Sequence, residues 1–267
     1  MSFTGKWING YNSVMTLTQA LDGTISGSYS STTGSSGEYY VLGYANPADP
    51  TPTVGQPAAL SIYWKPYNVV PADPSWHWVS GLSGQMILAS DASPSLVLLH
   101  AMVATCDFPK VPATAGTYVD KLVYTPYTPG TTVATLAPKI ARPAAAAADP
   151  VSGTWVCSNP QVTLSLQTVV AGRYGQLSGV IDIPGHLESM IQGFADIDAV
   201  SGGLNLEGVS VAAFDSTTGQ CISLAGSLNL TTGVLTLTDL TSSATTTNPN
   251  NTYLQTTTAT WIFTRSA

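Results

Sequence analysis

Polar and aromatic side chains that could hold a small ligand gather near the ends of short strand-like segments in the first half of the chain. Asn9 and Ser13 flank the turn after Trp7, Tyr29 ends the next strand, and Ser31 follows it in a Gly/Ser loop. Tryptophans that could add indole rings to the same site come later in the chain, in 61–65 and 75–78. Amide and hydroxyl donors converge on a carbonyl while tryptophan faces enclose the remainder of a ligand. These residues predict a site for a molecule with a neutral polar head and an apolar body.

The composition excludes several other classes of function. Only 9% of the 267 residues are charged, the net charge is −7, and the 8 Lys and Arg form no basic patch, so nucleic acid is not expected as a partner. No apolar run is long enough to span a bilayer, so no membrane is expected. No signal peptide is visible, and localisation stays open: secreted if the chain is a mature form, otherwise cytoplasmic. The three cysteines allow one disulfide at most.

No catalytic constellation accompanies the candidate site. The chain shows no Ser-His-Asp order with family spacing, no cluster of metal ligands and no paired carboxylates in a motif. We therefore expect a protein that is not an enzyme and that uses no cofactor or metal.

Two similar halves flank a Pro/Ala/Thr-rich segment at 128–150, which we interpret as a linker. The segment Thr4-Gly5-Lys6-Trp7 is matched by Ser152-Gly153-Thr154-Trp155, and alternating strands follow each at similar spacing. This order indicates a tandem duplication, with about eight strand candidates in each half. The predicted fold is all-β, with two eight-stranded antiparallel up-and-down barrels at 1–127 and 151–267. An open sandwich is the structural alternative.

Three stretches of the first half resemble the opening strands of the avidin/streptavidin family. They are Gly5-Lys-Trp-Ile-Asn-Gly-Tyr-Asn-Ser13, Asp22-Gly-Thr-Ile-Ser-Gly-Ser-Tyr29 and Tyr40-Val-Leu42. Trp64-Lys65 resembles the fifth strand of the family and Ser75 to Gly81 the sixth. The resemblance is good over 3–84 and poor over 85–127. It implies a closed barrel that binds biotin in its open end.

The resemblance also implies roles for individual residues. Asn9, Ser13 and Tyr29 would donate hydrogen bonds to the ureido oxygen of biotin, and Ser31 would accept one from a ureido N–H. Trp64 would pack on the bicyclic ring and the valeryl chain.

The remaining implied contacts lie around the side chain of biotin. Ser75 would lie near the carboxylate, and Ser35 with its loop would close over it. His77 would take the place of the hydroxyl near the ring sulfur. Either Trp78 or Val79 would line the wall, because a one-residue change of register exchanges the two faces of a strand.

The late strands of the first half depart from the family pattern. Val97 is predicted where the family has a tryptophan on its seventh strand, and Tyr118 where a neighbouring subunit lends one. The ureido-binding aspartate of the eighth strand has no clear match. Thr125 or Pro126 would stand there. Asp107 would take this place if the last strands were aligned differently.

The second half keeps Trp155 but loses the polar set. Cys157 takes the place of Asn9, Gln161 that of Ser13 and Ile181 that of Tyr29, so we expect no biotin site of the family type there.

We further hypothesise that the two barrels pack as an intramolecular pseudo-dimer. The seam is expected between 96–99 and 234–237, where both barrels carry apolar strand faces. Homo-oligomers remain open.

Two functions remain in competition. The leading hypothesis is a non-enzymatic protein that binds and sequesters biotin through its N-terminal barrel. The alternative is an avidin-fold module that has lost biotin and binds another small ligand, such as a sugar or an apolar molecule, or a protein partner.

Overall fold

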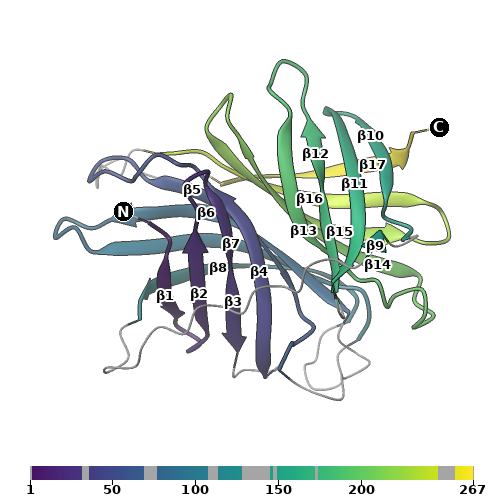
Figure 1. Cartoon of the computed structure of the whole chain (residues 1–267), viewed down its shortest axis with the longest axis horizontal. Helices are drawn as coiled ribbons and strands as arrows, with labels where there is room; N and C mark the ends of the chain where they lie inside the picture. The colour runs from purple at the N-terminus through teal and green to yellow at the C-terminus, as the bar shows by residue number, and fades with distance from the viewer. Residues whose placement is uncertain are drawn as a thin grey trace.

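The computed structural model describes residues 2–31, 36–68, 77–107, 114–127, 145–146, 149–171, 174–245 and 256–266. All regular structure in these ranges is β-strand, and it forms two closed eight-stranded antiparallel barrels (Figure 1). The predicted all-β fold with two up-and-down barrels is therefore confirmed. None of the described residues lies in a helix long and apolar enough to cross a bilayer.

The first barrel follows the order of the chain. Its strands are β1 (Gly5–Asn9), β2 (Val14–Gln19), β3 (Thr24–Ser31), β4 (Gly37–Ala45), β5 (Gln56–Tyr63), β6 (Trp78–Leu88), β7 (Pro94–Ala104) and β8 (Gly116–Pro126). Each strand pairs with the next, and β1 pairs with β8 to close the sheet, with Trp7 opposite Pro126 and Asn9 opposite Tyr124. Closure leaves no unpaired sheet edge.

The second barrel repeats this arrangement. Its strands are β10 (Gly153–Ser158), β11 (Gln161–Ala171), β12 (Tyr174–Asp182), β13 (Ser189–Ala195), β14 (Leu206–Asp215), β15 (Gln220–Asn229), β16 (Val234–Ser242) and β17 (Thr256–Arg265). Strand β10 closes the barrel by pairing with both β11 and β17. A two-residue strand, β9 (Ala145–Ala146), adds to the edge of β11.

Alternation of side chains explains how each barrel fills its interior. In β2 and β3 every second residue is buried, including Met15 and Leu17 from one strand and Ile25 and Tyr29 from the other. The tight turn between them needs Gly23, whose φ is 88° and whose Cβ would meet the carbonyl oxygen of Ala45. Each barrel thus has its own apolar core.

The two barrels pack against each other through the outer faces of β4, β5 and β6 on one side and β13, β14 and β15 on the other (Figure 1). Strand β5 is buried at all its positions, because its inner face fills the barrel and its outer face meets the second barrel. An apolar cluster that includes Tyr63, Val79 and Phe194 crosses the seam.

The seam predicted at 96–99 and 234–237 is wrong. Leu96 and Leu98 lie in the core of the first barrel, and Leu235 and Leu237 lie in the core of the second. These leucines point inward and fill the interiors of the two barrels, so they are not available to the seam.

Serine side chains form several of the hydrogen bonds across the seam. The Ser61 hydroxyl donates to the Ser210 carbonyl oxygen at 2.9 Å, and the Ser210 hydroxyl donates to the Ser80 carbonyl oxygen at 2.7 Å. The Ser83 hydroxyl lies 2.9 Å from that of Ser242. These short side chains let the two sheets approach closely while their polar atoms stay hydrogen-bonded.

Gly81 offers a test of this close approach. A Cβ at this position would lie 2.5 Å from the Ser223 hydroxyl oxygen and 2.9 Å from the Ala225 Cβ. Gly81→Val is therefore expected to lower the free energy of unfolding by about 1–3 kcal/mol, measured by urea denaturation. Gly10→Val is the control, since Gly10 is exposed with open space around it. An equally stable Gly81→Val protein would contradict the seam.

Candidate functional site

The turn after β1 is organised by the Asn9 side chain. Its Oδ1 accepts hydrogen bonds from the backbone N–H groups of Tyr11 at 3.0 Å and Ser13 at 3.1 Å. These bonds close the loop around Asn12, which has a positive φ of 60°. Asn9 and Ser13 are both buried. With its oxygen used by the turn, the Asn9 amide is free to direct its N–H donors into the barrel.

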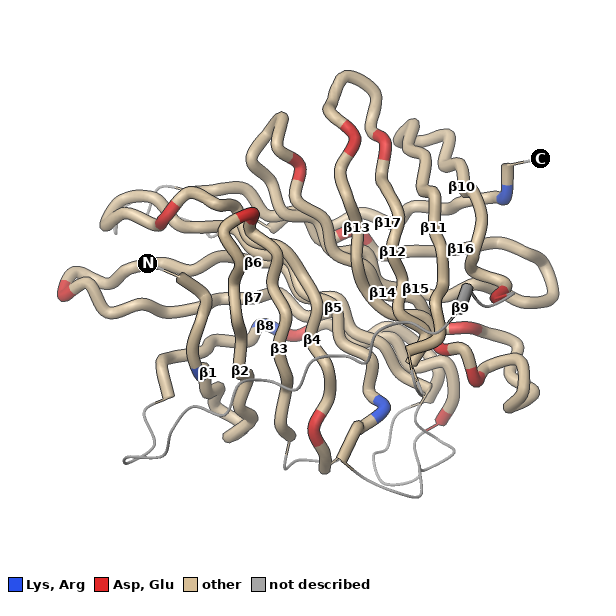
Figure 2. Tube along the Cα trace, in the orientation of Figure 1, with Lys and Arg blue, Asp and Glu red and all other residues tan. Residues whose placement is uncertain are grey.

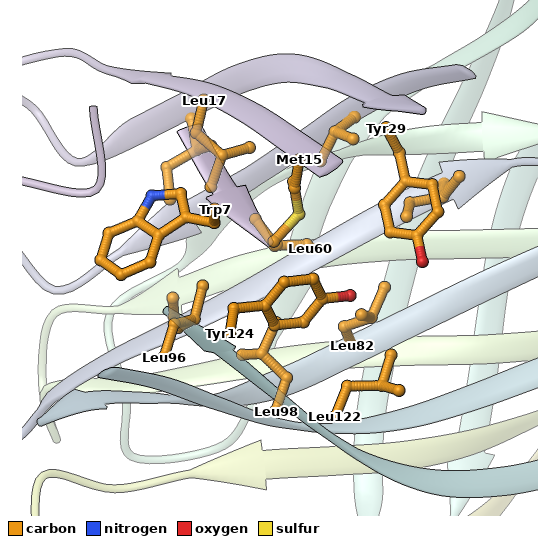
Figure 3. Close-up of a cluster of buried hydrophobic side chains, with 14 of the residues drawn as sticks. Trp7, Met15, Leu17, Tyr29, Leu60, Leu82, Leu96, Leu98, Leu122 and Tyr124 are labelled. Carbon is orange, nitrogen blue, oxygen red and sulfur yellow. The ribbon is translucent and has the colours of Figure 1, made fainter. Parts of the chain in front are cut away.

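Three polar groups meet inside the first barrel next to this turn. The Asn9 Nδ2 donates to the Tyr29 hydroxyl at 3.4 Å, and Tyr124 is the cross-strand neighbour of Asn9. Figure 3 shows the Tyr29 and Tyr124 rings in the barrel core, with their hydroxyls pointing toward the same region. Burial and the nearby Tyr29 hydroxyl raise the pKa of Tyr124 well above its ordinary value, so it stays a protonated donor.

The Tyr124 hydroxyl is fully buried and has no hydrogen-bond partner among the described residues. A buried hydroxyl without a partner costs about 1–3 kcal/mol, so its presence calls for an explanation. A polar ligand atom placed between Asn9, Tyr29 and Tyr124 would supply the missing partner.

Trp64 forms an aromatic wall beside these donors. It follows β5, and its ring makes edge contacts with Tyr29 at 5.3 Å and with Tyr39 at 4.9 Å between centroids. Its indole Nε1 donates to the Ser80 hydroxyl at 2.7 Å. The ring is thus fixed in orientation, as a flat surface for an apolar ligand must be.

His100 extends this arrangement from β7. Its Nε2 lies 2.7 Å from the Ser80 hydroxyl oxygen, and its ring centroid lies 6.5 Å from that of Trp64. Burial lowers the pKa of His100 to about 4, against the opposing charge of Asp120. The ring is therefore neutral near pH 7, and a chain of hydrogen bonds can run from the Trp64 N–H through the Ser80 hydroxyl to His100.

The register of β6 settles which of two residues faces the barrel. Trp78 lies in the core of the first barrel, and its Nε1 donates to the Cys106 carbonyl oxygen at 3.2 Å. Val79 faces the second barrel. Of the two alternatives left open by the sequence, Trp78 is the one that faces the interior of the first barrel.

The other predicted site residues have different outcomes. Ser31, at the end of β3, is buried. His77 does not join the group, because its ring turns to Asp196 of the second barrel, with Nδ1 and Oδ2 2.6 Å apart. Ser35 and Ser75 lie outside the described residues.

The late strands correct four expectations. Val97, expected on the pocket wall, is paired with Gln85 on the outer face, while Leu96, Leu98 and their successor His100 point inward. Thr125 and Pro126 are exposed, and Tyr124 takes the inward position beside Asn9. Asp107 is exposed after the end of β7.

Tyr118, predicted in place of the tryptophan lent by a neighbour, is exposed near the start of β8, and its hydroxyl donates to the Thr114 carbonyl oxygen at 2.8 Å. Sequence reasoning missed Tyr39, Ser80, His100 and Tyr124. The alternation of Leu122 and Tyr124 was the available signal for the last of these.

Comparison with known protein families matches residues 1–96 to the Avidin family. The first barrel is similar to the avidin family over these residues, which are about a third of the chain. The match covers β1 to β6 and the start of β7, which are also the strands whose inward residues form the candidate site, apart from His100 and Tyr124. No curated protein matches the chain. The resemblance stated from the opening strands is confirmed, and the avidin-like fold of the chain is tandem.

The second avidin-like barrel has a different interior at the equivalent positions. Trp155 pairs with Leu164 as Trp7 pairs with Met15, which places Cys157 where Asn9 stands. The position of Ser13 is taken by Val162, which is buried opposite Cys157. The expected Gln161 is exposed one residue earlier, because the connection between the two paired positions is one residue longer in this hairpin.

Apolar residues also replace the two tyrosines of the candidate site in the second barrel. Ile181 faces Leu164, as Tyr29 faces Met15, so the predicted loss of that hydroxyl is confirmed. Phe263 falls where Tyr124 stands in the first barrel. Each polar donor around Asn9 has an apolar counterpart here.

Charged groups contribute little to the candidate site. Figure 2 shows the few charged residues scattered mostly toward strand ends and turns, with no basic patch along the described trace. No cluster of three or more His, Cys, Asp or Glu side chains that could hold a metal occurs within the described ranges. Cys157 and Cys221 are buried, and no disulfide joins them.

Proposed function

We propose that this chain is a non-enzymatic binding protein whose first barrel, residues 1–127, binds biotin. The observation that carries the proposal is the convergence of Asn9, Tyr29 and the unsatisfied Tyr124 hydroxyl beside Trp64. Three donors at one point suit the carbonyl oxygen of a cyclic urea, and the indole suits the apolar ring system behind it. The avidin-family match of 1–96 supports the same ligand.

The barrel of residues 151–267 has a structural role in this proposal. A ureido oxygen among Cys157, Ile181 and Phe263 would lose its hydrogen bonds, at about 1–3 kcal/mol for each group left unpaired. Its outer face instead covers that of the first barrel.

A second candidate is an avidin-like module with a changed ligand. The specific observation that favours it is Tyr124, which stands where the family resemblance implies an aspartate. A tyrosine hydroxyl can donate to a ligand oxygen and accept from a ligand N–H, but it lacks the negative charge that strengthens a hydrogen bond from a ureido N–H. A ligand with an acceptor in place of that N–H would then be preferred.

Isothermal titration calorimetry of the full chain with biotin separates these candidates. We expect one biotin per chain, because the donors are present in the first barrel and replaced in the second. Two equivalent sites would contradict the assigned role of the second barrel. No binding would sink the biotin proposal and leave the changed-ligand module.

A further inference from the structure

A loop of the second barrel reaches the end of the first barrel that carries the candidate site. It runs from Asp196, just after β13, to the start of β14 at Leu206. The Asp196 side chain is fully buried. Both of its carboxylate oxygens contact the first barrel: Oδ1 accepts from the Tyr63 hydroxyl at 2.6 Å, and Oδ2 lies 2.6 Å from the His77 Nδ1.

The neighbouring Asp198 makes a second link. Its carboxylate forms an ion pair with the Lys65 ammonium group, which is itself buried. The Asp198 backbone N–H donates to the Asp196 Oδ1 at 3.2 Å, so the two aspartates form one unit. Burial of Asp196 makes its hydrogen bonds stronger than exposed ones.

The residues that these aspartates hold alternate with the tryptophans of the candidate site. Tyr63 and Lys65 lie on either side of Trp64 in the chain, and His77 precedes Trp78. The Trp64 backbone N–H donates to the Trp78 carbonyl oxygen at 2.9 Å, so the two segments are neighbours. Successive side chains of an extended segment point to opposite faces. Fixing the outer residues to the second barrel therefore fixes the inner tryptophans.

From this geometry we propose that Asp196 and Asp198 of the second barrel are positioning residues for Trp64 and Trp78 in the ligand site of the first. The second barrel then contributes to the site by holding its wall from outside. Among its described residues, it inserts no side chain into the site. The inference about ligand affinity rests on the proposed function, whereas the positioning itself does not.

The test uses the full chain labelled with fluorotryptophan, without any ligand. The tryptophan signals in the ¹⁹F NMR spectrum are assigned by single Trp→Phe variants. In Asp196→Asn and Asp198→Asn we expect the Trp64 and Trp78 signals to shift or broaden, while those of Trp7 and Trp155 stay in place. The latter two lie in the barrel cores and report that both barrels remain folded.

Ser242→Ala is the matched control, because it removes a seam contact to Ser83 on β6 that does not flank either tryptophan. Unchanged Trp64 and Trp78 signals in both aspartate variants would overturn the proposal, and so would equal shifts in Ser242→Ala. If Asp196→Asn does not fold, Asp198→Asn decides, since that side chain is 44% exposed and its replacement buries no new group.

Biotin titration of the same proteins adds the functional arm. We expect binding about tenfold weaker or more in Asp196→Asn and unchanged in Ser242→Ala, a tenfold change being about 1.4 kcal/mol. Wild-type protein that binds no biotin would refute the proposed ligand, and the ¹⁹F spectra would still decide the positioning role. Wild-type affinity in both aspartate variants would contradict the proposal.

Discussion

Replacing Tyr29 by phenylalanine is expected to weaken biotin binding by about 5-fold to 150-fold. The change deletes one donor to a desolvated carbonyl, worth about 1–3 kcal/mol. The phenyl ring keeps the edge contact with Trp64, so the thermal unfolding midpoint should change little. Asn9→Ala should have a similar effect on affinity, measured by calorimetry in the same buffer.

The structure sharpens the design of this experiment. Asn9→Ala also removes the acceptor for two backbone N–H groups of the turn, so part of its effect comes from the turn. Tyr124→Phe avoids this, because the Tyr124 hydroxyl has no partner among the described residues, and its loss should cost affinity without costing stability. Thr125→Ala, on the exposed face of β8, is the control. Unchanged affinity in both Tyr29→Phe and Tyr124→Phe would remove the assigned pocket.

Replacing Glu207 by glutamine is expected to stabilise the protein by about 3 kcal/mol at pH 7. Glu207 lies on β14 and is 1% exposed, and neither carboxyl oxygen has a hydrogen-bond partner among the described residues. Burial, with the negative charge of Asp149, raises the pKa of Glu207 from 4.5 to about 9. The folded protein therefore holds this carboxyl protonated at pH 7, while the unfolded chain releases the proton.

The direction of the pH dependence follows from this difference. Between pH 4.5 and about 9 the folded state binds one more proton, so its stability falls by about 1.4 kcal/mol for each unit of rising pH. The contribution is fully present below pH 4.5 and lost by about pH 9. Glutamine cannot ionise, so Glu207→Gln removes this dependence of stability on pH.

Urea denaturation at pH 4.5, 7 and 9 checks this prediction. Glu207→Gln should match the wild type at pH 4.5 and exceed it increasingly at the two higher values. Glu188→Gln is the control, because Glu188 is exposed in the turn before β13 and its replacement should be neutral. A glutamine variant that is less stable than the wild type at pH 9 would show that the carboxyl makes a contact important to the fold.

The fold of both barrels could be predicted because its determinants are local or repeated along the chain. The Gly-x-Trp segments at 5–7 and 153–155 open both halves, and strict alternation in β2 and β11 identifies strands with one buried face. The early site residues Asn9, Ser13 and Tyr29 follow from the same stretch, since turn and strand spacing place them on one face. They are close in sequence and lie in or beside strands that pair directly, β1 with β2 and β2 with β3.

Other features were decided by the second barrel. Strand β5 is buried on both faces, and so is most of β6, so alternation could not say whether Trp78 or Val79 faces the ligand site. His77 matches the pattern of a pocket residue, yet Asp196 lies 119 positions away in the chain and draws its ring outward. No local pattern contains that contact.

The sequence by itself determined two barrels and the polar turn of the candidate site, because hydrophobic alternation and turn chemistry act over a few residues. Only the tertiary structure decided where the barrels meet and that Tyr124 completes the donors. Ser61, Ser83 and Gly81 resemble solvent-facing residues in the sequence, because a small polar side chain is equally compatible with water and with a closely packed sheet whose acceptors it can reach. The position of that second sheet is set by contacts between residues more than a hundred positions apart, such as Ser61 and Ser210.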